Sequence, residues 1–203
     1  MRRLLFAGDS ITDCGRTFFD PDVAAGHLGD GWVRIVAALL GRRFPGVHEV
    51  RNAGVSGDRV ADLLARWERD VAAFAPHVLT VLVGVNDSLL EPRTPDAELD
   101  RALRTLLGRV PASVEQLVVA EPFVLPVDAR TEAVRAAALP HRALIRQAAE
   151  EAGATVLPLW ERFDEAARDV APTWWAHDGI HPTPAGHALI AETWLDALAD
   201  HLP

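Results

Sequence analysis

The chain has 203 residues, of which 49% are hydrophobic and 24% charged, as is typical of a single globular domain spanning residues 1–203. All 20 basic residues are arginine, tyrosine is absent and cysteine occurs once, which excludes Schiff-base chemistry, Walker-A phosphate sites, Ser–Lys dyads and an intrachain disulfide. The net charge of −9 disfavours binding to a phosphate backbone, so we expect no nucleic-acid partner.

The first predicted element is a strand at Leu4–Ala7. This apolar run is too short for the core of a signal peptide, and no run in the chain approaches the roughly 18 residues that a membrane span needs. We therefore expect a cytoplasmic protein without a membrane partner. The sequence leaves the oligomeric state open, a homo-oligomer included.

Four further apolar runs are bounded by turn residues and lack the alternation of a half-exposed strand. They are His48–Asn52, Val78–Val83, Gln116–Ala120 and Thr155–Leu159. Runs of this kind predict strands that are buried on both faces, as in a parallel sheet.

Helical patterns separate these strands. Between Asp58 and Phe74, apolar residues recur at helical spacing, and the charged residues, Arg66 among them, mostly occupy the other side. Similar helices are predicted at Trp32–Leu40, Asp96–Leu107, Glu132–Ala152 and Pro184–Leu198. Alternating strands and helices predict a doubly wound α/β domain, in which ligands bind outside the carboxyl ends of the strands.

The residues that follow the first three strands can together form an acyl-transfer site. Ser10 lies in a strand-to-helix turn, where its hydroxyl would be exposed, although a serine at such a position is more often a helix cap. Gly57 follows the second strand and Asn86 the third. A backbone N–H and a side-chain amide at these positions can stabilise the oxyanion that develops when a hydroxyl attacks an ester.

A second group of candidate residues lies near the carboxyl end of the chain. Asp178 and His181 are three residues apart, in a turn that leads into a helix. The aspartate can accept a hydrogen bond from one imidazole nitrogen, which leaves the other nitrogen to take the proton of Ser10. A capped turn before Pro182 and its following helix is the alternative interpretation.

These four blocks, in this order and spacing, resemble the SGNH hydrolases, also called GDSL esterases, over nearly the whole chain. Ser10, Gly57, Asn86 and His181 match the four residues for which that family is named. The resemblance implies a three-layer α/β/α flavodoxin-like fold with a five-stranded parallel sheet. It also implies ester hydrolysis through an acyl-enzyme at Ser10, with His181 as base, Asp178 as its partner, an oxyanion hole of Ser10, Gly57 and Asn86, and no cofactor or metal.

A closer likeness is to the acetylxylan-esterase-like branch, which deacetylates plant cell-wall sugars. It is carried by the strings GDSITDCGR, LGDGWVRIVAALL, NAGVSGDRVADLLARWERDV and IHPTPAGH. This likeness implies a serine esterase that removes an acetyl or another short acyl group from a small-molecule or oligosaccharide ester.

The chain departs from that branch at two places beside the expected site. His177 stands where those relatives tend to carry a tryptophan before the catalytic aspartate, and Ser88–Leu90 stands where an aromatic residue often follows the Asn-Asp pair. We therefore expect His177, together with the nearby Trp174 and Trp175, to contact the substrate.

Three other interpretations stay open. A metal-dependent hydrolase would use His177, Asp178, His181 and His187 as ligands. A lysophospholipase-like or thioesterase-like acyl hydrolase would share the family and its triad. A non-catalytic saccharide-binding module would keep the fold and use exposed tryptophans to stack on sugars.

Four residues near these motifs receive structural predictions. Trp67 and Trp194 lie on the apolar faces of predicted helices, so we expect them in the core. Cys14 is expected to be a small apolar filler, and Asp9 to cap the helix that follows it or to hold its turn.

Overall fold

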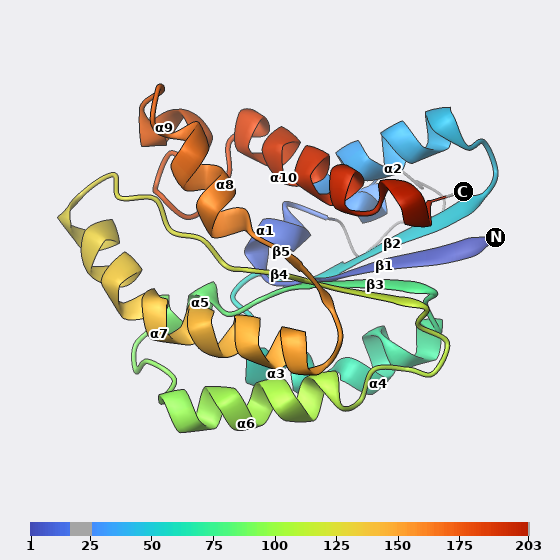
Figure 1. Ribbon diagram of the computed structural model, residues 1–203, viewed down its shortest axis with the longest axis horizontal. Helices are drawn as coiled ribbons and strands as arrows, with labels where there is room; N and C mark the ends of the chain where they lie inside the picture. The colour runs from blue at the N-terminus through green and yellow to red at the C-terminus, as the bar shows by residue number, and fades with distance from the viewer. Residues whose placement is uncertain (17–25, 203) are drawn as a thin grey trace.

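The computed structural model describes residues 1–16 and 26–202 (Figure 1). In this part of the chain, five parallel strands form one sheet in the order β2-β1-β3-β4-β5. The strands are β1 (Arg2–Gly8), β2 (His48–Gly54), β3 (Val78–Leu82), β4 (Gln116–Ala120) and β5 (Thr155–Leu157). The predicted flavodoxin-like fold with a five-stranded parallel sheet is confirmed.

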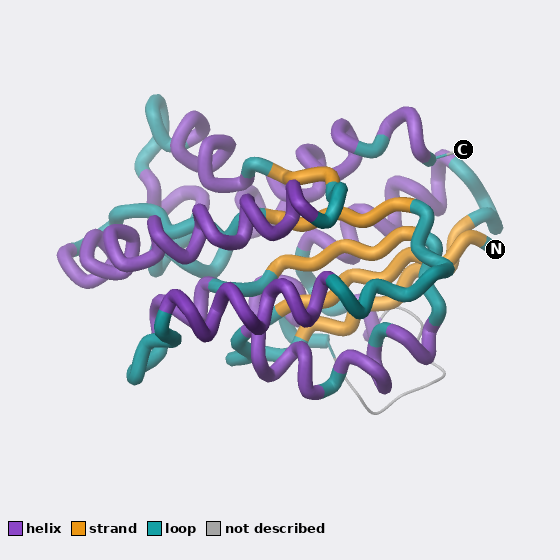
Figure 2. The backbone as a smooth tube through the Cα atoms, turned by 60° about the horizontal axis from the view of Figure 1, so that its bottom comes forward, coloured by secondary structure: helices purple, strands orange, loops and turns teal. Residues whose placement is uncertain are grey.

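Helices cover both faces of the sheet, which lies between them as the middle of three layers (Figures 1 and 2). One face carries α2 (Trp32–Arg43), α8 (Leu159–Ala166) and α10 (Pro184–Ala197). The other carries α3 (Val60–Ala65), α4 (Trp67–Asp70), α6 (Asp96–Leu107) and α7 (Ala129–Glu151). The shorter elements are α1 (Ser10–Asp13), η1 (Gly26–Leu28), η2 (Ala72–Phe74), α5 (Val85–Leu89), α9 (Pro172–Trp175) and η3 (Ala199–His201). Within the described ranges, no helix is both long and apolar enough to cross a membrane.

Successive side chains of a strand point to opposite faces of the sheet, so an inner strand contributes side chains to both hydrophobic cores. On β1, Leu4 and Phe6 pack beneath α2 and α10, whereas Leu5 and Ala7 pack against α3, α6 and α7. Full burial of a leucine or phenylalanine side chain contributes roughly 1.5–3 kcal/mol. Apolar runs without alternation are therefore what the inner strands of this sheet require. The prediction that His48–Asn52 is buried on both faces is wrong, because β2 is an edge strand and exposes Glu49 and Arg51 at alternate positions.

The two tryptophans predicted in the core are both buried, which confirms their assignment. The indole N–H of Trp194 donates to Thr80 Oγ1 at 2.8 Å, and that of Trp67 donates to the carbonyl oxygen of Arg109 at 2.9 Å. Each buried N–H thus has a partner, as an indole in a core requires.

The continuous helix predicted between Asp58 and Phe74 is wrong. The structure has α3, α4 and η2 in its place, and the first break falls at Arg66, whose φ of −104° and ψ of 6° are not helical. Arg66 was also predicted on the exposed face, yet only 9% of its side chain is exposed. Its guanidinium donates to the carbonyl oxygens of Gly8 and Ala53 and to the carboxylate of Asp58. These hydrogen bonds favour the break over a regular helix.

The last strand is shorter than predicted, because β5 ends at Leu157 and α8 already begins at Leu159. Pro158 stands between them and has no backbone N–H with which to continue a ladder of hydrogen bonds. At α7, the helix begins three residues before the predicted Glu132. The cause is a reciprocal cap, in which Asp128 Oδ1 accepts from the Thr131 N–H at 2.7 Å while Thr131 Oγ1 accepts from the Asp128 N–H at 2.9 Å.

Candidate active site

Ser10 lies at the carboxyl end of β1, at the first position of α1. The turn before it is tight, since a Cβ atom on Gly8 would lie 2.2 Å from the carbonyl oxygen of Leu82 on β3. Asp9 caps α1 as predicted, with its Oδ1 accepting from the N–H of Ile11 at 3.0 Å. Ser10 therefore lies at the edge of the sheet where the parallel strands end.

Ser10, His181 and Asp178 form a continuous series of hydrogen bonds, although Ser10 is far from the other two in sequence. The distance from Ser10 Oγ to His181 Nε2 is 3.0 Å, and that from His181 Nδ1 to Asp178 Oδ2 is 2.7 Å. Because an ionised carboxylate only accepts, the proton of a neutral His181 belongs on Nδ1. Nε2 then presents its lone pair to the hydroxyl of Ser10.

The turn that carries these two side chains is held in place by its own backbone. Asp178 Oδ1 accepts from the N–H groups of Ile180 at 3.0 Å and of His181 at 2.8 Å. Gly179 has a φ of 78°, and a Cβ atom there would lie 2.4 Å from the carbonyl oxygen of Leu125, so a side chain is excluded. The N–H of Leu125 donates to the Gly179 carbonyl oxygen at 2.8 Å, which joins this turn to the segment after β4.

The hydrogen bonds of Asp178 also keep it ionised. Its partial burial would raise the pKa, but the bonds from the His181 ring and from the N–H groups of His181 and Ile180 outweigh this effect and lower the pKa below its usual value. Asp178 is therefore a carboxylate at neutral pH, placed where it can stabilise a positive charge on the ring of His181.

Of the predicted oxyanion-hole residues on the other two strands, Gly57 lies in the loop after β2 and Asn86 lies in α5, the short helix that follows β3. Gly57 has a φ of 86°, and a Cβ atom built on it would meet open space. Asn86 is buried, and its Nδ2 donates one proton to the carbonyl oxygen of Asp58 at 2.9 Å, which leaves the second N–H for another acceptor. Within residues 1–16 and 26–202, the backbone N–H groups of Ser10 and Gly57 have no acceptor.

Asp9, beside Ser10, is fully buried, and its Oδ2 has no hydrogen-bond partner among the described residues. Burial raises the pKa of this carboxyl to about 7, against the lowering effects of the Ile11 N–H and of the charge on His181. The folded chain thus binds this proton more tightly than the unfolded chain does.

Replacing Asp9 with asparagine is expected to stabilise the protein at neutral pH. The free energy of unfolding of the wild type should lose the contribution of Asp9 as the pH rises from about 4 to about 7, since the folded state holds a proton that the unfolded state has already released. The asparagine would carry no charge and would still cap α1 through its side-chain oxygen. Urea unfolding at about pH 4.5 and about pH 8 measures this, and an equal gain at both pH values would contradict it.

The four residues of the alternative metal-site interpretation do not converge. His181 is engaged by Ser10 and Asp178, whereas His187 Nδ1 accepts from the N–H of Trp32 at 3.2 Å and its Nε2 lies 3.3 Å from Cys14 Sγ. Burial lowers the pKa of His187 to about 4, so it is neutral. Across the part of the chain that is described, no group of three or more His, Cys, Asp or Glu side chains could hold a metal ion.

Cys14 differs from its predicted role as an apolar filler, because its thiol is only half-buried and contacts an imidazole. Since Nδ1 of His187 accepts a backbone N–H, Nε2 carries the proton of the neutral ring and donates towards the sulfur. His187 therefore cannot serve as a base for Cys14. Burial raises the pKa of the Cys14 thiol, which also keeps it unreactive.

The three residues predicted at the substrate have different surroundings. Trp175 is partly buried against the core beneath α10, and its indole N–H donates to the Ala166 carbonyl oxygen at 3.0 Å. These contacts are structural. Trp174 is 62% exposed and His177 is exposed. A role in substrate binding stays a prediction for all three residues.

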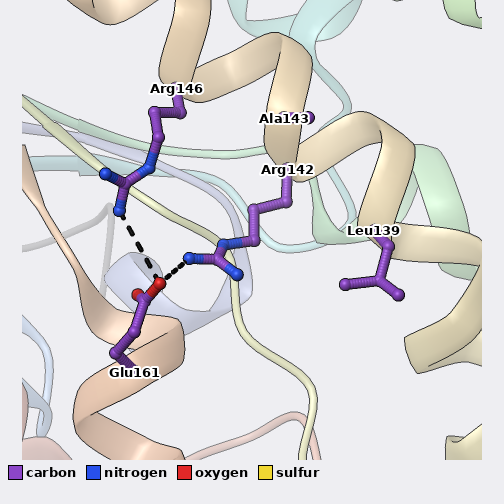
Figure 3. A pocket seen from close by; sticks show the side chains of 5 residues that line it. All are labelled: Leu139, Arg142, Ala143, Arg146 and Glu161. Atoms are coloured by element: carbon purple, nitrogen blue, oxygen red, sulfur yellow. Dashed lines mark hydrogen bonds and ion pairs between the residues drawn. The ribbon is translucent and has the colours of Figure 1, made fainter.

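A separate cavity of about 280 Å³ lies between α7 and α8 (Figure 3). Its lining residues are Leu139, Arg142, Ala143, Arg146 and Glu161. Arg142 and Arg146 both point towards Glu161, and both also pair with the fully buried Glu121, at 3.2 Å and 2.6 Å. Because these charges neutralise one another, we interpret the cluster as an ion-pair network that joins the two helices.

Known proteins resemble this chain over almost its full length. The sequence matches the GDSL-like Lipase/Acylhydrolase family over residues 6–189. An acetylxylan esterase from Geobacillus stearothermophilus is 32% identical, in an alignment that covers 95% of this chain and 92% of that protein. A solved structure of a variant acetyl xylan esterase from the same organism has a TM-score of 0.87 at 31% identity, covering 97% and 94% of the two chains. An alpha/beta hydrolase enzyme from the metagenome of Lake Arreo, Spain, has a TM-score of 0.86 at 30% identity, covering 98% and 95%.

A serine, a histidine and a carboxylate that are hydrogen-bonded in series at the carboxyl edge of a flavodoxin-like sheet have the arrangement found in serine hydrolases. The chain belongs to the GDSL-like lipase/acylhydrolase family, and it is a carboxylic ester hydrolase. The resemblance predicted from the sequence, including the likeness to acetylxylan esterases, is confirmed.

Proposed function

We propose that this protein is a serine esterase that removes acetyl, or another short acyl group, from an esterified carbohydrate through an acyl-enzyme at Ser10. The observation that carries the proposal is the series of short hydrogen bonds from Ser10 through His181 to Asp178. The kind of ester is suggested by the relatives, since the matches compared above include acetylxylan esterase from Geobacillus stearothermophilus, in sequence and in structure.

The geometry accounts for each proton in the proposed cycle. Ser10 Oγ attacks the ester carbonyl carbon while its proton passes to His181 Nε2, and Asp178 stabilises the imidazolium. The carbonyl oxygen becomes an oxyanion, which accepts from the N–H groups of Ser10 and Gly57 and from Asn86 Nδ2. His181 then returns the proton to the leaving alcohol. Water repeats the sequence in the second half and releases the acid and a free Ser10.

Variants of the relative also support these roles. Three solved structures of the Geobacillus stearothermophilus esterase are described as catalytic mutants, in which a serine, an aspartate or a histidine is replaced by alanine. The aspartate and histidine are three residues apart in that chain, as Asp178 and His181 are in this one.

The enzyme is expected to prefer acetyl to long-chain esters. The sequence has no long apolar segment between its motifs that could form a lid over a fatty chain. We expect p-nitrophenyl acetate to be hydrolysed with a higher kcat/KM than p-nitrophenyl palmitate, and acetate release to identify the natural alcohol among acetylated xylosides, glucosamines and sialates. A preference for palmitate, or for lysophospholipid or thioester substrates, would contradict the proposal. Sugar binding without turnover would instead indicate a non-catalytic module.

A further inference from the structure

The side chain of Arg66 reaches the carboxyl ends of two strands from the break between α3 and α4. Its Nη2 donates to the carbonyl oxygen of Gly8 at 3.1 Å, and its Nη1 donates to the carbonyl oxygen of Ala53 at 2.8 Å. Nε donates to Asp58 Oδ2 at 2.6 Å, and Nη1 also donates to Asp70 Oδ2 at 3.0 Å. The guanidinium is thus a buried junction with four partners on different segments of the chain.

Those segments carry the groups that face the reacting ester. Gly8 ends β1 two residues before Ser10, and Asp58 directly follows Gly57. The backbone oxygen of Asp58 in turn accepts from Asn86 Nδ2 at 2.9 Å. One connected set of hydrogen bonds, through Arg66 and Asp58, therefore joins the supports of all three oxyanion-hole donors.

We propose that Arg66, together with Asp58, is a positioning residue that fixes the three oxyanion-hole donors relative to one another. The inference rests on the proposed function, in which these donors bind the oxyanion. Such donors stabilise a transition state only when they are held in place before the reaction, and a displacement of about 1 Å can cost on the order of 10²-fold in rate. Arg66 does not itself touch the substrate, so its contribution belongs to the geometry of the hole.

Replacing Arg66 with methionine tests this most directly, because methionine keeps an unbranched apolar stem and loses every donor. We expect kcat for p-nitrophenyl acetate to fall on the order of tenfold to hundredfold, with KM changed by less than about twofold, since the hole acts on the transition state. Arg69→Met is the matched control. Arg69 lies on α4, the helix that begins directly after the break, and it also pairs with Asp70. Its side chain is 76% exposed, and its described hydrogen bonds do not reach Gly8 or Ala53.

Two variants of Asp58 are expected to destabilise the fold less than Arg66→Met does. Asp58→Asn keeps an oxygen that can accept from Arg66 Nε and is expected to retain kcat within about threefold, whereas Asp58→Ala removes the link and should lose on the order of tenfold. A tetrahedral analogue separates positioning from general destabilisation. Phenylboronic acid, bound covalently at Ser10, places an oxygen in the hole, so its Ki should rise in parallel with the fall in kcat while KM stays constant.

The outcomes for the inference and for the proposed function are distinct. If the wild type does not hydrolyse p-nitrophenyl acetate, the proposed function fails. If the wild type is active, and Arg66→Met or Asp58→Ala has native circular dichroism with unchanged kcat and unchanged boronate affinity, the positioning role of Arg66 is wrong and the proposed function stands. A fall in kcat matched by a rise in the Ki of phenylboronic acid by a similar factor, with Arg69→Met at wild-type values, would establish the role.

Discussion

Replacing Ser10 with alanine is expected to lower kcat for p-nitrophenyl acetate by on the order of 10⁴–10⁶-fold, because no other group in the site can form the acyl-enzyme. Ser10 Oγ contacts His181 Nε2, and both side chains are partly exposed, so the free energy of unfolding should change by less than about 0.5 kcal/mol. Initial rates and urea unfolding measure the two quantities.

Ser113→Ala is the matched control for this variant. Ser113 donates to the carbonyl oxygen of Pro76 at 2.9 Å, near the start of β3 and therefore at the opposite edge of the sheet from Ser10. Its loss should leave kcat unchanged. Activity of Ser10→Ala at the wild-type level would show that a different nucleophile carries the reaction.

Replacing Asp178 with asparagine is expected to lower kcat by on the order of 10³–10⁴-fold, although the shape of the side chain is conserved. Asp178 Oδ1 accepts two backbone N–H groups, so the oxygen of asparagine must take that position. The amide NH₂ then faces His181 Nδ1 in place of Oδ2. An NH₂ can only donate to that nitrogen, which forces the imidazole proton onto Nε2 and removes the lone pair that Ser10 needs.

Asp100→Asn, at an ion pair with Arg104 on α6, is the control for the loss of a carboxylate. It should change neither kcat nor KM. If Asp178→Asn kept more than about a tenth of wild-type kcat, the tautomer of His181 would not be set by Asp178, and the base would have to be activated in another way.

The inner strands β1, β3 and β4 were predictable from the sequence because most of their residues are buried on both faces. Leu4–Ala7 and Leu117–Ala120 are continuous apolar runs, and a parallel strand packed between helices requires such a run. The end of β5 was predicted wrongly because Pro158 interrupts a run that remains apolar through Leu159. The hydropathy of the segment does not indicate that Pro158 lacks a backbone N–H for the strand's hydrogen bonds.

The site residues were predictable as a set of motifs, but not the contacts that support them. Arg66 follows Leu63 by three residues, which places it at the border of the apolar face of the predicted helix. That spacing was the one indication in the sequence that its side chain is buried. Its partners at Gly8 and Ala53 come from other strands, so only the folded sheet brings them together. In the same way, the contact between His187 and Trp32 joins residues 155 positions apart.

The most direct test of the proposed mechanism is to identify the residue that an organophosphate modifies. Diethyl p-nitrophenyl phosphate should react once per chain, and proteolysis with mass spectrometry should locate the diethylphosphoryl group on Ser10. The same treatment of Ser10→Ala should leave the chain unmodified. A label on another residue, or an active wild-type enzyme that stays unlabelled and uninhibited, would contradict the assignment of Ser10 as the nucleophile.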